Sequence, residues 1–282
     1  MARVKTVQPM TNETVASGET PGGEVAGAEA SHGEALVGGP IAVDGVRGDV
    51  SGSEIARAEA ASSKSACTIV GCEKAGRAVI ASELDGGVLI ERIGPDRLDE
   101  YCSVPSLVEV QSILQVKAVD GGLGGLAMEL VPVPTPYIKD YDSYGETPAD
   151  WPAKWDMTSW CVLLATVGAK PVGAACVVTR TPDICMLEGR DDLAVLWDIR
   201  VAPEYKRRGI GKALFSASVQ WCREQGMKML KVETQNVNLP ACRFYASQGA
   251  QLGAINRFAY ANATWSHPDV RDEAMLLWYY RL

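Results

Sequence analysis

The chain has 282 residues, a formal net charge of −8 and a hydrophobic share of 47%. That share suits a globular core, and the acidic balance argues against a general nucleic-acid binder. No apolar run reaches membrane-spanning length, and residues 1–10 lack the apolar core of a secretory signal. The eight cysteines form no Cys-x-x-Cys pair, and there are only two histidines. We therefore expect a cytoplasmic protein with no metal site and neither a nucleic-acid nor a membrane partner.

Residues 1–80 differ in composition from the rest of the chain. They are rich in Gly, Ala, Glu and Ser and contain no aromatic residue. Such a segment buries too little apolar surface to offset its ordering entropy. The sequence predicts a disordered, dispensable extension over 1–80 and one folded domain over 81–282.

The first half of the domain reads as short strands and one helix between glycine and proline turns. Asp96 is the expected cap of the helix, and Pro132, Pro134 and Pro136 are expected to end a strand. The predicted elements are strand 88–93, a short helix ending at residue 101, strand 108–119, a glycine-rich turn over 121–125 and strand 126–131.

A loop-like segment, 137–155, combines aromatic and acidic residues. One hypothesis is that its aromatic rings and carboxylates grip an organic cation. The alternative is a loop held to the core by its aromatic side chains, with the acids facing water. The substrate-binding candidates in and around this segment are Tyr141, Trp155, Asp156 and Trp197.

The second half alternates strands and helices more clearly. A β-hairpin over 160–167 and 172–179 is followed by a buried strand over 193–201. The remaining predicted elements are helix 209–225, strand 229–233, helix 239–248 and strands 252–260 and 273–282.

The turn between the 193–201 strand and its following helix is suited to phosphate. Helix-start N–H groups attract anions, and Gly209 and Gly211 allow a close backbone approach. A Walker loop is excluded because Ala213 follows Lys212 where a hydroxyl residue is needed. A Rossmann fingerprint is excluded because Leu214 replaces the third glycine. The simplest alternative is a basic helix start after a tight turn.

Lys206-Arg207-Arg208-Gly209-Ile210-Gly211 resembles the coenzyme A loop of the GNAT acetyltransferase superfamily, with Lys in place of Arg or Gln at its first position. The order of elements resembles that superfamily too, as does the run Asn238 to Tyr245. The resemblance implies an α+β fold, an α/β/α sandwich with a mixed, splayed central sheet. The closer resemblance is to streptothricin-type acetyltransferases, through 233–236, 241–245 and 275–280. Residues 87–156 do not obviously match that family.

The resemblance implies acetyl transfer from acetyl-CoA to a primary amine, with roles for named residues. Asp198 and Glu233 end neighbouring strands, and either is the candidate base or a structural acceptor. Tyr245 is the candidate hydrogen-bond donor to the leaving thiolate or a core tyrosine, and Asn238 binds the coenzyme or caps its helix. The coenzyme-binding residues implied are Ile199, Arg200, Val201, Lys206, Arg207, Arg208, Gly209, Ile210, Gly211, Lys212, Asn238 and Tyr245.

The expected acceptor is a small cationic amine, such as a streptothricin-like antibiotic, which points to antibiotic resistance. The first alternative is an amine of a protein or peptide. The second is a coenzyme A sensor that performs no chemistry. Dimers are common in the superfamily, and a homodimer is compatible with the sequence.

Overall fold

The computed structural model describes residues 79–81, 87–261 and 270–282. Nearly all of the extension expected over 1–80 therefore lies outside the described residues. The helices are α1 (Leu98–Cys102), α2 (Trp151–Lys154), α3 (Ile210–Glu224) and α4 (Leu239–Ser247). The strands are β1 (Val79–Ala81), β2 (Val88–Ile93), β3 (Leu107–Ala118), β4 (Leu126–Asp140), β5 (Cys161–Val167), β6 (Lys170–Thr179), β7 (Leu193–Val201), β8 (Met229–Gln235), β9 (Gln251–Asn256) and β10 (Met275–Arg281).

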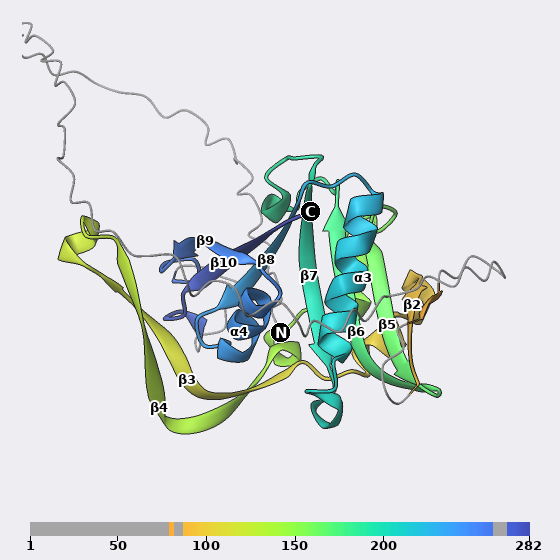
Figure 1. Cartoon of the computed structure of the whole chain (residues 1–282), viewed down its shortest axis with the longest axis horizontal. Helices are drawn as coiled ribbons and strands as arrows, with labels where there is room; N and C mark the ends of the chain where they lie inside the picture. Colours follow the sequence, from red (N-terminus) through yellow and green to blue (C-terminus); the bar gives the residue numbers. More distant parts are fainter. Residues whose placement is uncertain (1–78, 82–86, 262–269) are drawn as a thin grey trace, which may run out of the picture. The chain divides into compact units, whose positions relative to one another are not determined.

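The described strands form an eight-stranded sheet of order β1-β2-β5-β6-β7-β8-β10-β9 and a two-stranded ribbon, β3–β4 (Figure 1). In the large sheet β7 and β8 are parallel, and the other neighbouring pairs are antiparallel. The pairing of β7 with β8 stops at Val195 and Lys231, although both strands continue. The mixed, splayed sheet expected from the sequence is thus confirmed.

Two hydrophobic cores lie on opposite faces of this sheet. The α3 face holds α3 and α4 against side chains such as Leu196 and Ile199. The α1 face holds Tyr101 and Trp151 against side chains such as Trp197. Figure 1 shows α3 lying across the strands that precede β8. Strand β7 is buried along its whole length because both faces are covered, as its continuous apolar sequence predicts.

Two local features shape the sheet beneath α3. A β-carbon on Gly173 of β6 would lie 3.0 Å from Ile210 Cγ2 and 3.1 Å from Leu214 Cδ1, so glycine lets α3 pack closely on the sheet. In β7, Cys176 faces Asp198 but Val177 faces Leu196, which leaves Trp197 as the extra residue of a β-bulge. The bulge places both Trp197 and Asp198 toward the α1 face, where they contact Trp160 and Tyr101 respectively.

Two sequence predictions in the first half are wrong. Strand β4 does not end at Pro132 but continues to Asp140. Strand β4 pairs with β3 alone, and Pro134 and Pro136 lie where the register with β3 shifts, between the paired residues Pro132 and Tyr137, so they interrupt no regular ladder. Asp96 does not cap α1: it lies in a short 3₁₀ turn, and Arg97 occupies the cap position without a side-chain bond.

A buried ion pair joins the ribbon to the main sheet. The ammonium of Lys139 on β4 donates to both carboxylate oxygens of Glu273, shortly before β10. The side chains are 2% and 8% exposed. Two buried charges that neutralise each other are tolerated, but one left alone is strongly unfavourable.

Lys139→Met is therefore expected to lower the free energy of unfolding by about 3–5 kcal/mol, because the buried carboxylate of Glu273 loses its ammonium partner. The double variant Lys139→Met/Glu273→Leu should recover most of that loss. Urea unfolding of both variants measures the difference. An equal loss in the single and double variants would show that the pair adds little beyond packing.

Candidate active site

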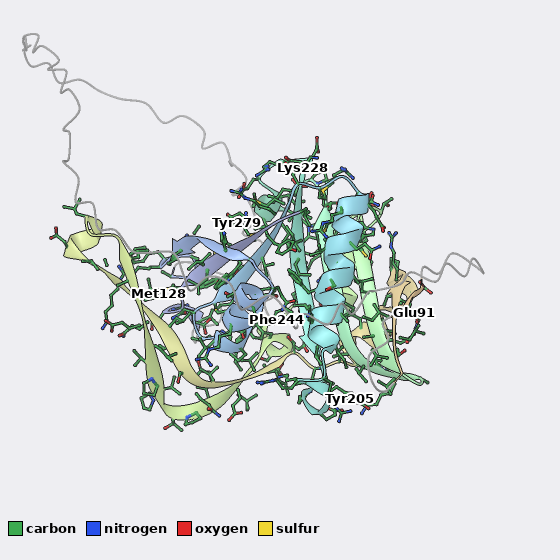
Figure 2. All side chains as sticks on the ribbon, in the orientation of Figure 1. Glu91, Met128, Tyr205, Lys228, Phe244 and Tyr279 are labelled. Carbon is green, nitrogen blue, oxygen red and sulfur yellow. The ribbon has the colours of Figure 1, made fainter. Side chains whose placement is uncertain are left out.

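A cavity of about 670 Å³ opens where β7 and β8 diverge on the α3 face. Its walls come from β3, the end of β7, the turn over 203–209, the start of α3, and α4. In Figure 2 Phe244 lies on α4 toward α3, and Tyr205 lies on the turn that precedes α3. Both side chains line the cavity, as do Ile199 and Val201 of β7.

One end of the cavity is basic and rich in backbone donors. Gly209 is the cap residue of α3, with φ of 82° and no side-chain cap bond, so the first N–H groups of the helix are left for a ligand. Lys206, Arg207 and Lys212 line this end, as the sequence predicted. Arg243 of α4 adds a fourth cation that the sequence reading missed. The arrangement suits a phosphorylated ligand.

Four of the residues expected to bind coenzyme do not line the cavity. Ile210 belongs to the core of the α3 face, and Arg208 stacks on Tyr205 at 5.0 Å. Asn238 is buried and caps α4, its Oδ1 accepting from the Ala241 N–H at 3.1 Å. The side chain of Arg200 is buried on the α1 face. Asn238 therefore caps α4, which is one of the two roles predicted for it.

Tyr245 of α4 also lines the cavity. Its side chain is fully buried and packs against Phe215 and Phe244. The hydroxyl has no hydrogen-bond partner among the described residues. Burial raises the pKa of Tyr245 well above its usual value, and the nearby charge of Asp198 raises it further. The phenol therefore stays protonated and can donate a hydrogen bond.

Asp198 is committed to a buried ion pair on the α1 face. Its Oδ2 accepts from Arg200 Nε at 2.7 Å and from the Tyr101 hydroxyl at 2.8 Å. Arg200 also donates to the Val104 carbonyl and faces Asp142 at 3.2 Å. Oδ1 of Asp198 has no partner in the described part of the chain. Its partners fit the structural alternative considered for Asp198.

Glu233 has a different environment one strand away. It is fully buried on β8, and its Oε1 accepts from the Tyr260 hydroxyl at 2.6 Å. No described group bonds to its Oε2. Burial raises the pKa of Glu233 to about 7, against the opposing effects of the Tyr260 hydrogen bond and the Lys231 charge. A carboxyl with this pKa can exchange a proton near neutral pH.

The aromatic and acidic segment is held to the core. Tyr141 and Trp151 are buried, and Trp155 stacks edge-to-face on buried Trp197 at 5.5 Å. Its acids mainly serve local structure: Asp150 closes a capping box with Thr147, and Glu146 pairs with Lys154.

Just beyond that segment, Asp156 is exposed and accepts from the backbone and hydroxyl of Thr158, which lowers the pKa of its carboxyl. Of the four substrate candidates, Trp155 and Asp156 therefore retain solvent access, while Tyr141 and Trp197 do not.

Fold and site together define a class of protein. Buried atoms of Asp198, Arg200, Glu233 and Tyr245, on or against the diverging strands, have no partner within the described residues. Such unsatisfied groups are uncommon away from ligand sites. The class is that of an α/β protein whose splayed sheet has a basic cavity on one face and buried titratable groups in and beside its diverging strands.

Comparison with known sequences agrees with this class. A model of the acetyltransferase (GNAT) family matches residues 129–250. Streptothricin acetyltransferase A of Bacillus subtilis (strain 168) is 34% identical over 88 residues, 31% of this chain and 48% of its own. A [ribosomal protein bS18]-alanine N-acetyltransferase of the same organism, provisionally assigned, is 30% identical over 87 residues, 31% of this chain and 53% of its own. The chain thus spans about half the length of these curated relatives.

The likeness of fold extends further than the likeness of sequence. A provisionally named streptothricin acetyltransferase from Bacillus anthracis str. Ames, solved in complex with acetyl coenzyme A, superposes with a TM-score of 0.54 at 22% identity. The superposition covers 69% of this chain and 99% of that one. The acetyltransferase (GNAT) family model thus matches residues 129–250, and the likeness of fold extends to the strands around them. Separately, no helix among the described residues is long and apolar enough to cross a membrane.

Proposed function

We propose that the protein transfers the acetyl group of acetyl-CoA to a primary amine. The observation that carries the proposal is that the buried, unpartnered hydroxyl of Tyr245 belongs to a residue lining the same cavity as a basic helix start. A ligand with a diphosphate at one end and a thioester at the other fits both. The acetyl coenzyme A bound to the Bacillus anthracis protein of the same fold supports this choice.

In this proposal the diphosphate lies on the first turn of α3, against Lys206, Arg207, Lys212 and Arg243. The pantetheine arm follows Ile199 to Val201, whose backbone is not paired with β8. The backbone of Arg200 belongs to this stretch even though its side chain does not reach the cavity. A backbone N–H near Val201 is the proposed donor to the oxyanion of the tetrahedral intermediate.

The amine must lose a proton before it attacks. A primary ammonium with a pKa of about 10.4 costs roughly 4–5 kcal/mol to deprotonate at pH 7. We assign this step to Glu233: both carboxyls have one oxygen without a described partner, but Asp198 forms an ion pair with Arg200, whereas Glu233 accepts from the neutral hydroxyl of Tyr260. The amine nitrogen then bonds to the acetyl carbon, the carbon–sulfur bond breaks, and the thiolate leaves with a hydrogen bond from Tyr245.

Tyr245→Phe is expected to lower turnover about tenfold while leaving the affinity for acetyl-CoA nearly unchanged, since one hydrogen bond from the phenol to the charged leaving thiolate is lost. The free energy of unfolding of the unliganded protein should not fall, because the hydroxyl removed is buried without a partner. Steady-state rates and thermal unfolding measure the two effects. Wild-type turnover in the variant would make Tyr245 a core residue.

The proposed acceptor is a small cationic amine, such as a streptothricin-like antibiotic. On the α1 face Arg200 is paired with two carboxylates, Asp198 and Asp142, so the charge of this cluster is negative and favours a cation. The name of the Bacillus subtilis relative supports an antibiotic acceptor, whereas that of the bS18-alanine relative supports the alternative of a protein amine.

Competition distinguishes the acceptors. Acetyl-CoA is supplied with streptothricin, a polyamine, an aminoglycoside and an alanine-ending peptide together, and the acetylated product is identified by mass spectrometry. Exclusive acetylation of a small cation supports the proposal, and exclusive acetylation of the peptide replaces it with the protein-amine alternative. If coenzyme binds and nothing is acetylated, the sensor alternative gains support.

A further inference from the structure

A chain of buried hydrogen bonds runs from the start of α4 to Glu233. It begins at Asn238, whose Oδ1 is occupied by the Ala241 N–H. Because that oxygen must accept, the Nδ2 end of the amide faces the other way and donates to the Tyr141 hydroxyl at 3.2 Å. The N-cap of α4 therefore fixes the orientation of the first link.

Each following link takes its direction from the one before. Tyr141 accepts from Asn238 and donates its own hydrogen to Gln235 Oε1 at 2.9 Å. The amide of Gln235 is thereby oriented, and its Nε2 donates to the Tyr260 hydroxyl at 3.1 Å. Tyr260 in turn donates to Glu233 Oε1 at 2.6 Å. All five side chains are at least nine-tenths buried, so water competes little for these bonds.

We propose that this one-way chain makes Oε2 the oxygen of Glu233 that receives the proton of the acceptor amine, and that Tyr260 is a positioning residue of the reaction. The inference rests on the proposed function. A proton on Oε1 would point at the hydrogen already donated by Tyr260, whereas Oε2 has no described partner. An N–H bond of the ammonium breaks, directly or through one water, and an O–H bond forms at Oε2.

The groups around Glu233 determine how removal of the Tyr260 hydroxyl would change the pKa of its carboxyl. Lys231, on the same strand, favours the charged carboxylate, while burial opposes it. Glu273 acts on Tyr260 and is itself paired with Lys139. On β10 the neighbour of Glu233 is the apolar Leu277. The Tyr260 hydroxyl is thus the neutral donor that stabilises the carboxylate, and its removal should raise the pKa of Glu233.

The test is the pH dependence of kcat/KM in Tyr260→Phe. The acidic limb of the profile should move to higher pH by about one unit. At pH values below the limb, kcat/KM should therefore be about tenfold lower than in wild type. At high pH, where the carboxylate is formed in both proteins, the rates should agree within a few-fold. Tyr279→Phe removes a hydroxyl elsewhere, from β10, and should keep the wild-type profile. A folded Tyr260→Phe protein with the wild-type limb would overturn the proposal.

A second readout does not depend on activity. Titration of the Glu233 carboxyl by carbon-13 NMR, assigned with Glu233→Gln, should give a higher pKa in Tyr260→Phe than in wild type. If Tyr260→Phe does not fold, Tyr141→Phe is titrated instead and should show a smaller upward shift. An unmoved carboxyl overturns the chain even if acetyl transfer is observed. A moved carboxyl in a protein that releases no thiol supports the chain and contradicts the proposed function.

Discussion

Replacing Gly211 with tryptophan is expected to weaken acetyl-CoA binding by about a hundredfold or more, which corresponds to about 3 kcal/mol. Gly211 lies in the first turn of α3 and lines the cavity. A β-carbon there would point between Phe244 and Val201, 3.7 Å from each. An indole extending from that position fills the space proposed for the diphosphate.

Gly211→Ala is the matched control. Its added methyl group makes ordinary van der Waals contacts, so the variant should fold and bind acetyl-CoA within a few-fold of wild type. Calorimetric titration gives both affinities, and circular dichroism confirms that the tryptophan variant is folded. A folded Gly211→Trp protein with unchanged affinity would exclude the α3 start as the coenzyme site.

Glu233→Gln is expected to lower kcat about 10²- to 10⁴-fold, the range for loss of a general base. The wild-type rate should rise with pH through about 7, because the carboxyl must be deprotonated to act and burial raises its pKa to about that value. The glutamine variant should lose this limb while keeping its affinity for acetyl-CoA. Asp198→Asn is the comparison variant. It removes the ion pair with Arg200, so the free energy of unfolding should fall. Its remaining activity should still rise with pH through about 7, because Glu233 is unchanged.

The same pKa shift predicts an effect on stability. Below pH 4.5 the carboxyl is neutral in both the folded and the unfolded chain, so its burial carries no charge penalty. Between pH 4.5 and 7 the unfolded chain ionises first, and the folded state loses about 3 kcal/mol relative to it. Glu233→Gln should remove that loss. The free energy of unfolding of the variant, relative to that of wild type, should therefore increase as pH rises from 5 to 8. Urea unfolding at the two values measures it, and a constant difference would contradict the raised pKa.

The sequence predicted the centre of the molecule well because the signals there are local. Strand β7 has the predicted bounds, 193–201, since its apolar run is continuous. Helix α3 lies within the predicted range because the basic glycine turn precedes it and Gly226 follows it. The proposed phosphate site depends on nearby residues of one turn and the helix start that follows, so the cavity-lining cations Lys206, Arg207 and Lys212 could be named in advance.

The parts that were missed depend on residues far apart in the chain. The continuation of β4 through Pro132 was missed because it depends on the pairing with β3 and on where its register shifts. Arg243 reaches the cavity through the packing of α4 beside α3, and its own neighbours in sequence give no phosphate signal. Tyr260 contacts Glu233 across 27 positions, through a turn beyond β9 that sequence pattern alone had assigned to a strand.

The difference between Asp198 and Glu233 was also not readable from sequence. Both are acids near the ends of parallel neighbouring strands, and the bulge at Trp197 and the ion pair with Arg200 appear only in three dimensions. The aromatic segment shows the same limit. Its composition suited a cation site and a loop held to the core equally, and only the structure shows that Tyr141 and Trp151 are buried in the core.

Release of free thiol from acetyl-CoA tests the central claim most directly. Wild type, Gly211→Trp and Glu233→Gln are each mixed with acetyl-CoA, with and without the amine panel. The account predicts amine-dependent release by wild type, strongly reduced in both variants, with coenzyme affinity lost only in Gly211→Trp. Amine-dependent release that is equal in all three proteins would contradict the assignment of this cavity and of Glu233 to acetyl transfer.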